Sequence, residues 1–315
     1  MNTTKTIALE RFKGSVGFTL ILRRWGNARQ GNVSTITTDD DPSQDKKTKA
    51  RIKLTKKLIE SKEFEAIASF QGALRQWIYS RTTPSFFREG FQLVKLEGVE
   101  MIEARLAKAQ AELDELVATL CLVYPGQVDE ARSALGRQFS ERDYPKAEDL
   151  PALFSIGWNW IAFTVPEGLP QELRQKEQDK LERQFADAGE QITLALRKGF
   201  MELVSHAASK LEVSPGEKPK QIRESMLGNI SEFIETFSQR NLMNDVELQL
   251  LVNKAKTILT GVTTQKLREK EDVRNKIMGE FTAIKSALDP LIVEQRSRVF
   301  EFEPSEAPEP EAVNA

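Results

Sequence analysis

The chain opens with large apolar residues at every second position. In the segment SVGFTLILRR, such residues occupy the even positions from Val16 to Leu22, an alternation that is typical of a β-strand. The glycines and asparagines of GNARQGN predict a turn, and the β-branched residues at 33–38 predict a second strand. We therefore expect a β-hairpin within residues 1–40.

A basic amphipathic helix is predicted next, up to about residue 60. Asp41 can accept hydrogen bonds from free backbone N–H groups, and Pro42 suits a first helical turn. Lysines recur every three or four residues on one expected face, at Lys46, Lys49, Lys53 and Lys56. An apolar stripe recurs every four residues, at Ala50, Leu54 and Leu58. Ser61 would cap a second helix, with apolar residues from Phe64 to Ile78 at spacings of three and four.

The most regular pattern in the chain predicts a long helix with a heptad seam of about three repeats. Its apolar positions step by four and three, at Ile102, Leu106, Ala109, Leu113, Leu116, Leu120 and Val123. Such a seam needs a partner helix, because isolated short helices are marginal in water. The residue before a proline is disfavoured in a helix, so Tyr124–Pro125 and Tyr144–Pro145 should bound a separate short helix.

Another strand is predicted where aromatic and β-branched residues cluster in FSIGWNWIAFTV, which Pro166 ends. We expect Trp158–Val165 to pair with the N-terminal hairpin in a small antiparallel sheet. The piece Gly90–Val94 would add a fourth short strand.

The C-terminal half reads as a series of helices. No proline interrupts the helical periodicity from Pro170 to about Glu212, and a helix of that length spans roughly 60 Å. It predicts a protruding coiled-coil arm. Shorter helices should follow from about Ile222 and from Asp245, and Thr263 or Thr264 should cap a final helix that reaches about Phe300 with a bend at Pro290.

The predicted fold class is mainly α with a small antiparallel β-sheet and long helical hairpin or coiled-coil arms. Residues 1–40 form the hairpin as part of the main domain, and 41–168 form a helical region with short strands. Residues 169–300 form a long helical hairpin or bundle. The acidic, proline-rich tail 301–315 has almost no large apolar groups, so we expect it to be disordered.

The segment SRTTPSFFREGF, from Ser80 to Phe91, separates two helical patterns. Three exposed phenylalanines would form a sticky patch, so the segment is best explained as a buried corner that fixes the long helix against the sheet. Gly90 would allow the turn, and Arg81 and Arg88 would emerge at the edge. A binding loop and an active-site lid are the alternatives.

Composition narrows the chemistry. A single cysteine precludes an intrachain disulfide framework and fits a reducing compartment, and no apolar run is long enough for a spanning helix or a secretory signal, so we expect a cytoplasmic protein with no membrane partner. One histidine and one cysteine cannot supply the usual zinc sets. His206 follows Glu202 by four residues, but a structural role fits it better than a metal site, and Cys121 beside the seam reads as a small apolar residue. No glycine-rich phosphate loop is present, so we expect no cofactor and no enzyme.

The charge is distributed unevenly along the chain. Residues 1–62 carry fourteen basic and six acidic residues, whereas the remainder carries 31 basic and 41 acidic residues. This asymmetry is compatible with three arrangements. The basic region could bind a polyanion, it could contact the acidic part of the same chain, or it could be a surface helix that water solvates. The nucleic-acid-binding candidates are Arg23, Arg24, Trp25, Arg29, Lys46, Lys49, Lys53 and Lys56. Cations attract phosphates and an indole stacks on unpaired bases, but we favour the simpler explanation, a tryptophan packed beneath the hairpin and a solvated basic helix.

Three stretches together indicate a relationship to a known family. They are GFTLILRRWGN, PSFFREGFQLV and the segment from YPGQVDEARSALGRQF to FTVPEGLP. Their order, over roughly residues 10–300, resembles an uncharacterised helical family of phages and bacterial mobile elements, whose members are often encoded beside MoxR-like ATPases and von Willebrand A-type proteins. The resemblance implies a helical accessory protein that works with an AAA+ ATPase, and it implies no functional residue.

Two hypotheses for the function follow. The leading one is a non-enzymatic interaction protein that presents a coiled-coil arm and an acidic tail to protein partners, a MoxR-like AAA+ ATPase or further copies of the chain among them. The alternative is a nucleic-acid-binding accessory protein that uses the basic N-terminal region.

Overall fold

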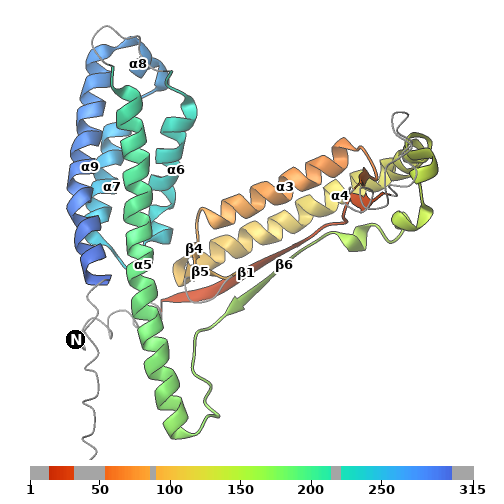
Figure 1. Ribbon diagram of the computed structural model, residues 1–315, viewed down its shortest axis with the longest axis horizontal. Coiled ribbons are helices and arrows are strands. Elements are labelled where there is room, and N and C mark those ends of the chain that lie inside the picture. Colours follow the sequence, from red (N-terminus) through yellow and green to blue (C-terminus); the bar gives the residue numbers. More distant parts are fainter. Residues whose placement is uncertain (1–13, 32–53, 86–89, 214–220, 300–315) are drawn as a thin grey trace, which may run out of the picture. The chain divides into compact units, whose positions relative to one another are not determined.

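The computed structural model describes residues 14–31, 54–85, 90–213 and 221–299, and of residues 294–299 the backbone alone. The chain divides into two compact units, which are described separately. The first, called the sheet unit, comprises Val16–Thr82 and Gly90–Ala162; the second, called the bundle unit, consists mainly of the chain from Phe163 onward. The predicted fold class, mainly α with a small antiparallel sheet, is confirmed (Figure 1).

The four-stranded sheet has the order β4–β5–β1–β6, in which β4 is the two-residue strand Thr83–Pro84. The strand β1 (Ser15–Arg23) pairs antiparallel with β6 (Ser155–Ile161), so that Leu20 lies opposite Trp158. The predicted pairing of the N-terminal strand with the tryptophan-rich strand is thus confirmed, although β6 begins and ends earlier than Trp158–Val165. The predicted fourth strand is β5 (Gln92–Lys95).

Among the described residues, the predicted N-terminal hairpin has no counterpart. Both edges of β1 are taken by β5 and β6, which come much later in the chain. The strand that follows, β2 (Ala28–Gln30), pairs instead with β3 (Thr55–Lys57) in a separate two-stranded ribbon. The expected strand at 33–38 lies outside the described residues.

The predicted basic helix fails in its C-terminal part. Thr55–Lys57 are extended in β3, and Leu54 and Leu58 flank that strand. Leu54 and Leu58 are four residues apart, which is compatible with a helix and with a strand alike, so their spacing does not discriminate. The lysines at 46, 49 and 53 lie outside the described residues.

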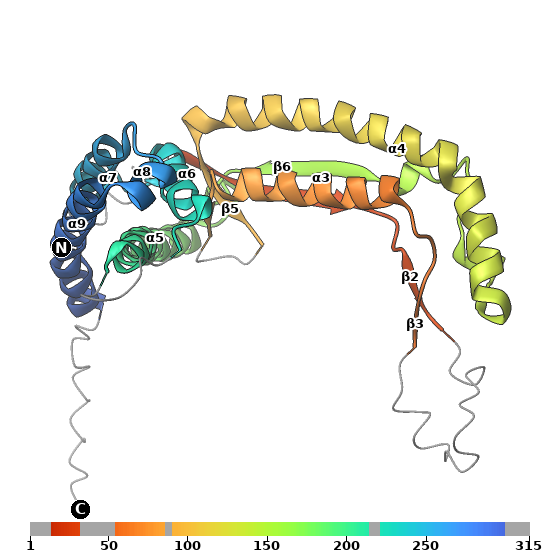
Figure 2. The ribbon, with the colours of Figure 1, turned by 90° about the horizontal axis from the view of Figure 1, so that it is seen from above.

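The sheet unit also contains the helices α3 (Lys62–Tyr79) and α4 (Val99–Leu135). They pack alongside each other, and α4 also packs on β6 (Figure 2). Ser61 caps α3 as predicted, since its Oγ accepts a hydrogen bond from Phe64 N at 3.3 Å. The carboxylate of Glu103 on α4 accepts hydrogen bonds from the indole N–H groups of Trp158, at 2.8 Å, and Trp160. These bonds fix the register between α4 and β6.

The seam of α4 differs from the prediction in two respects. Pro125 does not end the helix, which continues to Leu135. Leu116 and Val123 are only partly buried; between Ile102 and Tyr124 the buried residues recur at 102, 106, 109, 113, 117, 120 and 124. This is an 11-residue repeat, and its 3.67 residues per turn follow the natural α-helix more closely than a heptad does.

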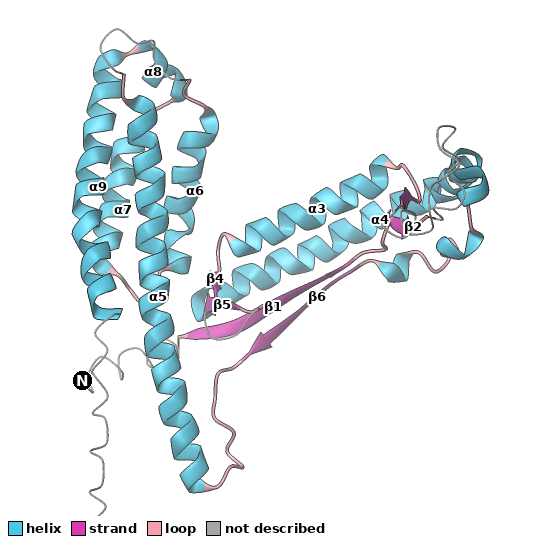
Figure 3. Ribbon diagram, viewed as in Figure 1, coloured by secondary structure: helices cyan, strands magenta, loops and turns pink. Residues whose placement is uncertain are grey.

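The bundle unit contains four helices in a closed arrangement: α5 (Gln171–Leu211), α6 (Glu224–Arg240), α7 (Val246–Leu259) and α9 (Glu271–Val299). Each packs against two others in the order α5–α6–α7–α9, and the short α8 (Thr264–Glu269) packs against α9 (Figure 3). The stacked rings of Phe200 and Phe233, 5.1 Å apart, join α5 to α6 inside this bundle.

The bundle largely follows the predicted helices. Asp245 and Thr263 cap α7 and α8 as expected. The final helix is divided, because α8 ends at Glu269 and α9 begins at Glu271, whereas Pro290 lies inside α9 without interrupting it. Within α5, the buried stripe passes through Ala188, Ile192 and Leu196, and Ala195 is exposed.

Candidate functional site

The predicted stacking residue Trp25 is part of the core. It is 6% exposed and makes edge or tilted contacts with the rings of Phe64, Tyr124 and Tyr144, at centroid distances of 6.0, 5.9 and 6.5 Å. Rings on several sides of the indole leave no open face for a base. The structure therefore supports the packing explanation of this tryptophan.

Of the cations predicted to bind nucleic acid, the structure describes Arg23, Arg24, Arg29 and Lys56, and Arg29 lies directly opposite Lys56 in the ribbon of β2 and β3. Lys56 has a 9% exposed side chain, and its Nζ lies 2.6 Å from Asp143 Oδ2 and donates to Gln138 O. Arg29 donates to the carbonyl oxygens of Gly26 and Ala28. Arg23 and Arg24 are exposed, with the guanidinium of Arg24 5.8 Å from the centre of the Phe64 ring. Lys46, Lys49 and Lys53 lie outside the described residues.

The corner predicted around SRTTPSFFREGF is described only at its ends. Arg81 lies 4.3 Å from the centre of the Trp77 ring, so its cation is held against α3. Gly90 has a φ of +80°, a conformation that suits glycine, in agreement with the predicted turn. Residues 86–89, which include Phe86, Phe87 and Arg88, lie outside the described residues.

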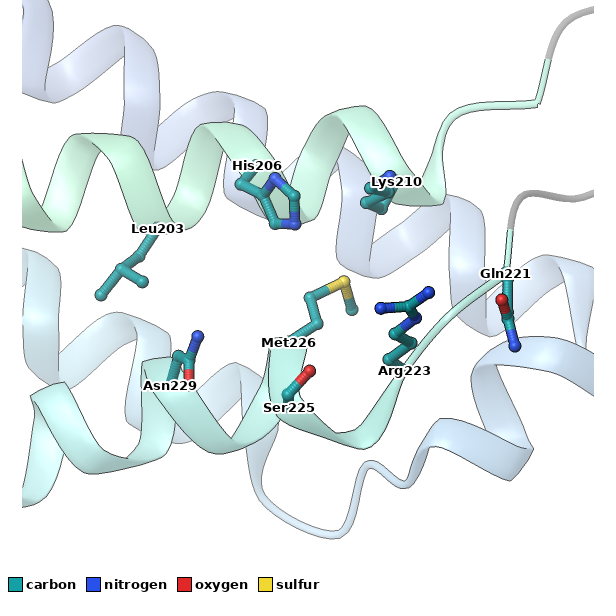
Figure 4. A pocket seen from close by; sticks show the side chains of 8 residues that line it. All are labelled: Leu203, His206, Lys210, Gln221, Arg223, Ser225, Met226 and Asn229. Atoms are coloured by element: carbon teal, nitrogen blue, oxygen red, sulfur yellow. The ribbon is translucent and has the colours of Figure 1, made fainter. Parts of the chain in front are cut away.

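The bundle unit contains a cavity of about 340 Å³ between α5 and α6 (Figure 4). From α5, Leu203, His206 and Lys210 face it. Its opposite wall belongs to the start of α6 and the residues before it: Gln221, Arg223, Ser225, Met226 and Asn229. Three of the eight lining residues are basic or titratable to a cation, and none is acidic.

Local structure accounts for this arrangement. His206 and Lys210 are one helical turn apart, which puts both on one face of α5. Arg223 occupies the position before the first residue of α6, and no side chain caps that helix. On α8, Arg268 donates from Nε to the carbonyl of Ile222 at 3.1 Å and so fixes the backbone beside Arg223. Sequence reasoning missed the cavity, because its cations are dispersed over residues 206–223 and show no recognisable spacing.

Other chemistry considered from the sequence finds no support here. Among the described residues, no three His, Cys, Asp or Glu side chains are grouped as metal ligands, and Glu202 does not line the cavity of His206. Partial burial raises the pKa of the Cys121 thiol, which favours the unreactive protonated form.

Exposed apolar residues form a small ridge on the bundle unit, here called the α7 ridge. It consists of Val246 and Leu250, which are 66% and 65% exposed and one helical turn apart. Val293 of α9 is 61% exposed. Arg197 donates hydrogen bonds to Glu247 and to the carbonyl oxygen of Leu291. The first turn of α7 and the part of α9 around Leu291 therefore contact the same arginine side chain.

The comparisons with known proteins give no relative. No family model, no curated protein and no solved structure matches the chain. Within the described part of the chain, no helix combines the length and the apolar character that crossing a membrane requires.

Proposed function

We propose that this chain is a non-enzymatic accessory protein that binds a protein partner through its bundle unit. The observation that carries the proposal is the α7 ridge, where Val246 and Leu250 present large apolar side chains to solvent. When a partner removes such apolar side chains from water, the complex is stabilised by roughly 25 cal/mol for each Å² of apolar surface that is buried.

The surroundings of the ridge suit a docking surface. Asp245 and Glu247 hold the start of α7 rigidly through Arg197, so little ordering cost would accompany binding. Polar groups follow the ridge along α7, at Asn253 and Lys254. An apolar centre with a polar rim is the usual anatomy of a protein interface.

The resemblance in sequence supplies the first partner to test, an AAA+ ATPase of the MoxR type from a phage or mobile element. The nucleic-acid alternative retains Arg23 and Arg24 as exposed cations. It predicts partners held through DNA or RNA rather than through the α7 ridge.

Affinity purification from the host, with and without nuclease, distinguishes the two. We expect a nuclease-resistant partner whose recovery falls when Val246→Ser and Leu250→Ser are combined. Leu122→Ser is the matched control, since Leu122 is 83% exposed in the sheet unit. Recovery that depends on nucleic acid, or that is equal for the ridge variant and the parent, would refute the proposal.

A further inference from the structure

We infer that the cavity between α5 and α6 binds a phosphate-bearing small molecule. Its wall contains the cationic side chains Lys210 and Arg223 and the imidazole of His206, and the remaining polar lining groups are the side chains of Gln221, Ser225 and Asn229. Every one of these six can donate a hydrogen bond, which is the requirement of a multidentate oxyanion.

The charge of the cavity is not neutralised from within. Among the residues that the structure describes, none that lines the cavity is acidic, and neither Lys210 nor Arg223 forms an ion pair. The acidic residues closest in sequence among the described ones, Glu202, Glu212 and Glu224, are exposed and absent from the wall. Lys210 and Arg223 lie on opposite walls of the cavity and carry the same charge, so an anion between them is attracted by both.

The backbone adds to the attraction. The first turn of the 17-residue helix α6 forms part of the wall, and the N-terminus of a helix carries a partial positive charge with free N–H groups. No side chain caps this end. The helix terminus therefore adds to the attraction for an anion, and the three basic side chains attract an anion without it.

The size and the lining favour an organic phosphate. About 340 Å³ lies at the lower end of the range for small-molecule sites and exceeds what a single inorganic phosphate fills. Leu203 and Met226 offer apolar surface beside the cations (Figure 4). The site would thus hold a phosphate at the basic side chains and a small organic group against these two residues.

Nuclear magnetic resonance gives a direct test, because His206 is the only histidine of the chain. In untagged full-length protein, one imidazole signal reports on the cavity. Pyrophosphate and a nucleoside monophosphate, added at constant ionic strength, should shift that signal with saturation. Tighter binding of the nucleotide would indicate contact with Leu203 and Met226, and equal binding would indicate recognition of phosphate alone; both support the site.

Matched variants separate a specific site from diffuse attraction. Lys210→Gln and Arg223→Gln should each weaken pyrophosphate binding about tenfold or more by calorimetry. Lys276→Gln on α9 removes an exposed lysine that does not line the cavity and should change the affinity less than about twofold. If Arg223→Gln perturbs the start of α6, Lys210→Gln alone still decides, because it lies inside α5. An unshifted His206 signal at about 10 mM pyrophosphate, or equal weakening by Lys276→Gln, would overturn the inference.

Discussion

Arg197 of α5 and Asp245 at the start of α7 form a bidentate ion pair, with Nε–Oδ2 and Nη2–Oδ1 distances of 2.7 and 3.1 Å. The pair is almost buried, with side-chain exposures of 12% and 4%. Asp245 also caps α7, because its Oδ1 accepts a hydrogen bond from Leu248 N. Arg197 Nη1 donates a hydrogen bond to the carbonyl oxygen of Leu291 on α9. One guanidinium thus joins three helices of the bundle.

Removal of this guanidinium should destabilise the bundle unit strongly. Arg197→Ala leaves the Asp245 carboxylate buried without its cation, a loss of about 3–5 kcal/mol. Arg197→Lys keeps the charge but cannot reproduce the bidentate geometry, so we expect a smaller loss of about 1–2 kcal/mol. Urea unfolding of each variant measures the difference. Lys254→Ala, which removes the more exposed ion pair with Glu280, serves as the control and should cost less than about 1 kcal/mol.

The 11-residue repeat of α4 predicts unequal effects of one substitution at two leucines. Leu113 is fully buried and Leu116 only partly. Leu113→Asp should cost several kcal/mol, because a buried unpaired charge loses its hydration, roughly 2–7 kcal/mol even for a neutral polar group. Leu116→Asp can turn its carboxylate to solvent and should cost clearly less. Equal losses in chemical denaturation would favour the heptad seam over the observed repeat.

Tyr124 should make the sheet unit sensitive to alkaline pH. Burial, followed by the neighbouring Tyr144, raises the pKa of Tyr124 from 10 to about 12, and its hydroxyl donates to Pro145 O at 2.9 Å. The folded state therefore holds the phenolic proton more tightly than the unfolded state. This contribution is complete below pH 10 and is lost as the pH rises towards 12, by about 1.4 kcal/mol for each pH unit in this window.

Tyr124→Phe isolates this effect. The variant should be less stable at neutral pH by about 1 kcal/mol, because it loses the hydrogen bond to Pro145 O. It lacks the ionisable phenol, so its stability should become equal to that of the falling parent between pH 10 and 12 and exceed it as the pH reaches about 12. Denaturation midpoints for the two proteins across this range provide the measurement, and parallel curves would contradict the prediction.

The role of Trp25 separates packing from nucleic-acid binding. Trp25→Ala should lower the free energy of unfolding by about 3–5 kcal/mol, as expected for a large buried aromatic residue. We expect that Trp25 makes no contribution to DNA binding at physiological salt. Titration with single-stranded DNA at several salt concentrations, using the parent and a variant with Arg23, Arg24, Lys46, Lys49 and Lys53 changed to Gln, measures this. Micromolar binding in the parent with a salt slope that flattens in the variant would support the alternative function.

Local signals in the sequence were sufficient for much of the fold. The helix caps at Ser61, Asp245 and Thr263, the length of α5 and the pairing of β1 with β6 all depend on short patterns that tertiary context reinforces. The failures have tertiary causes. Pro125 stays helical where Tyr124 is anchored by packing and by Pro145 O, and the other edge of β1 is taken by β5, which lies 69 or more residues further along the chain.

The candidate sites were less predictable than the fold. The sequence predicted Lys56 as a cation available to a phosphate, but Lys56 forms an ion pair with Asp143, which is distant in sequence. The cavity cations belong to two different helices or their ends, so only the packing of α5 and α6 brings His206, Lys210 and Arg223 together. No pattern in the sequence distinguishes Val246 and Leu250 from the buried residues of α7, because their exposure is set by the positions of α6 and α9.

The affinity of the purified partner for variants of the α7 ridge tests the proposed function most directly. Calorimetry would compare the parent, the combined Val246→Ser and Leu250→Ser variant, and the Leu122→Ser control. Each ridge side chain buried in an interface contributes about 1.5–3 kcal/mol, so we expect the ridge variant to bind at least about tenfold more weakly. The control should bind like the parent. Undiminished affinity of the ridge variant, with all three proteins folded, would contradict the proposal that this surface binds the partner.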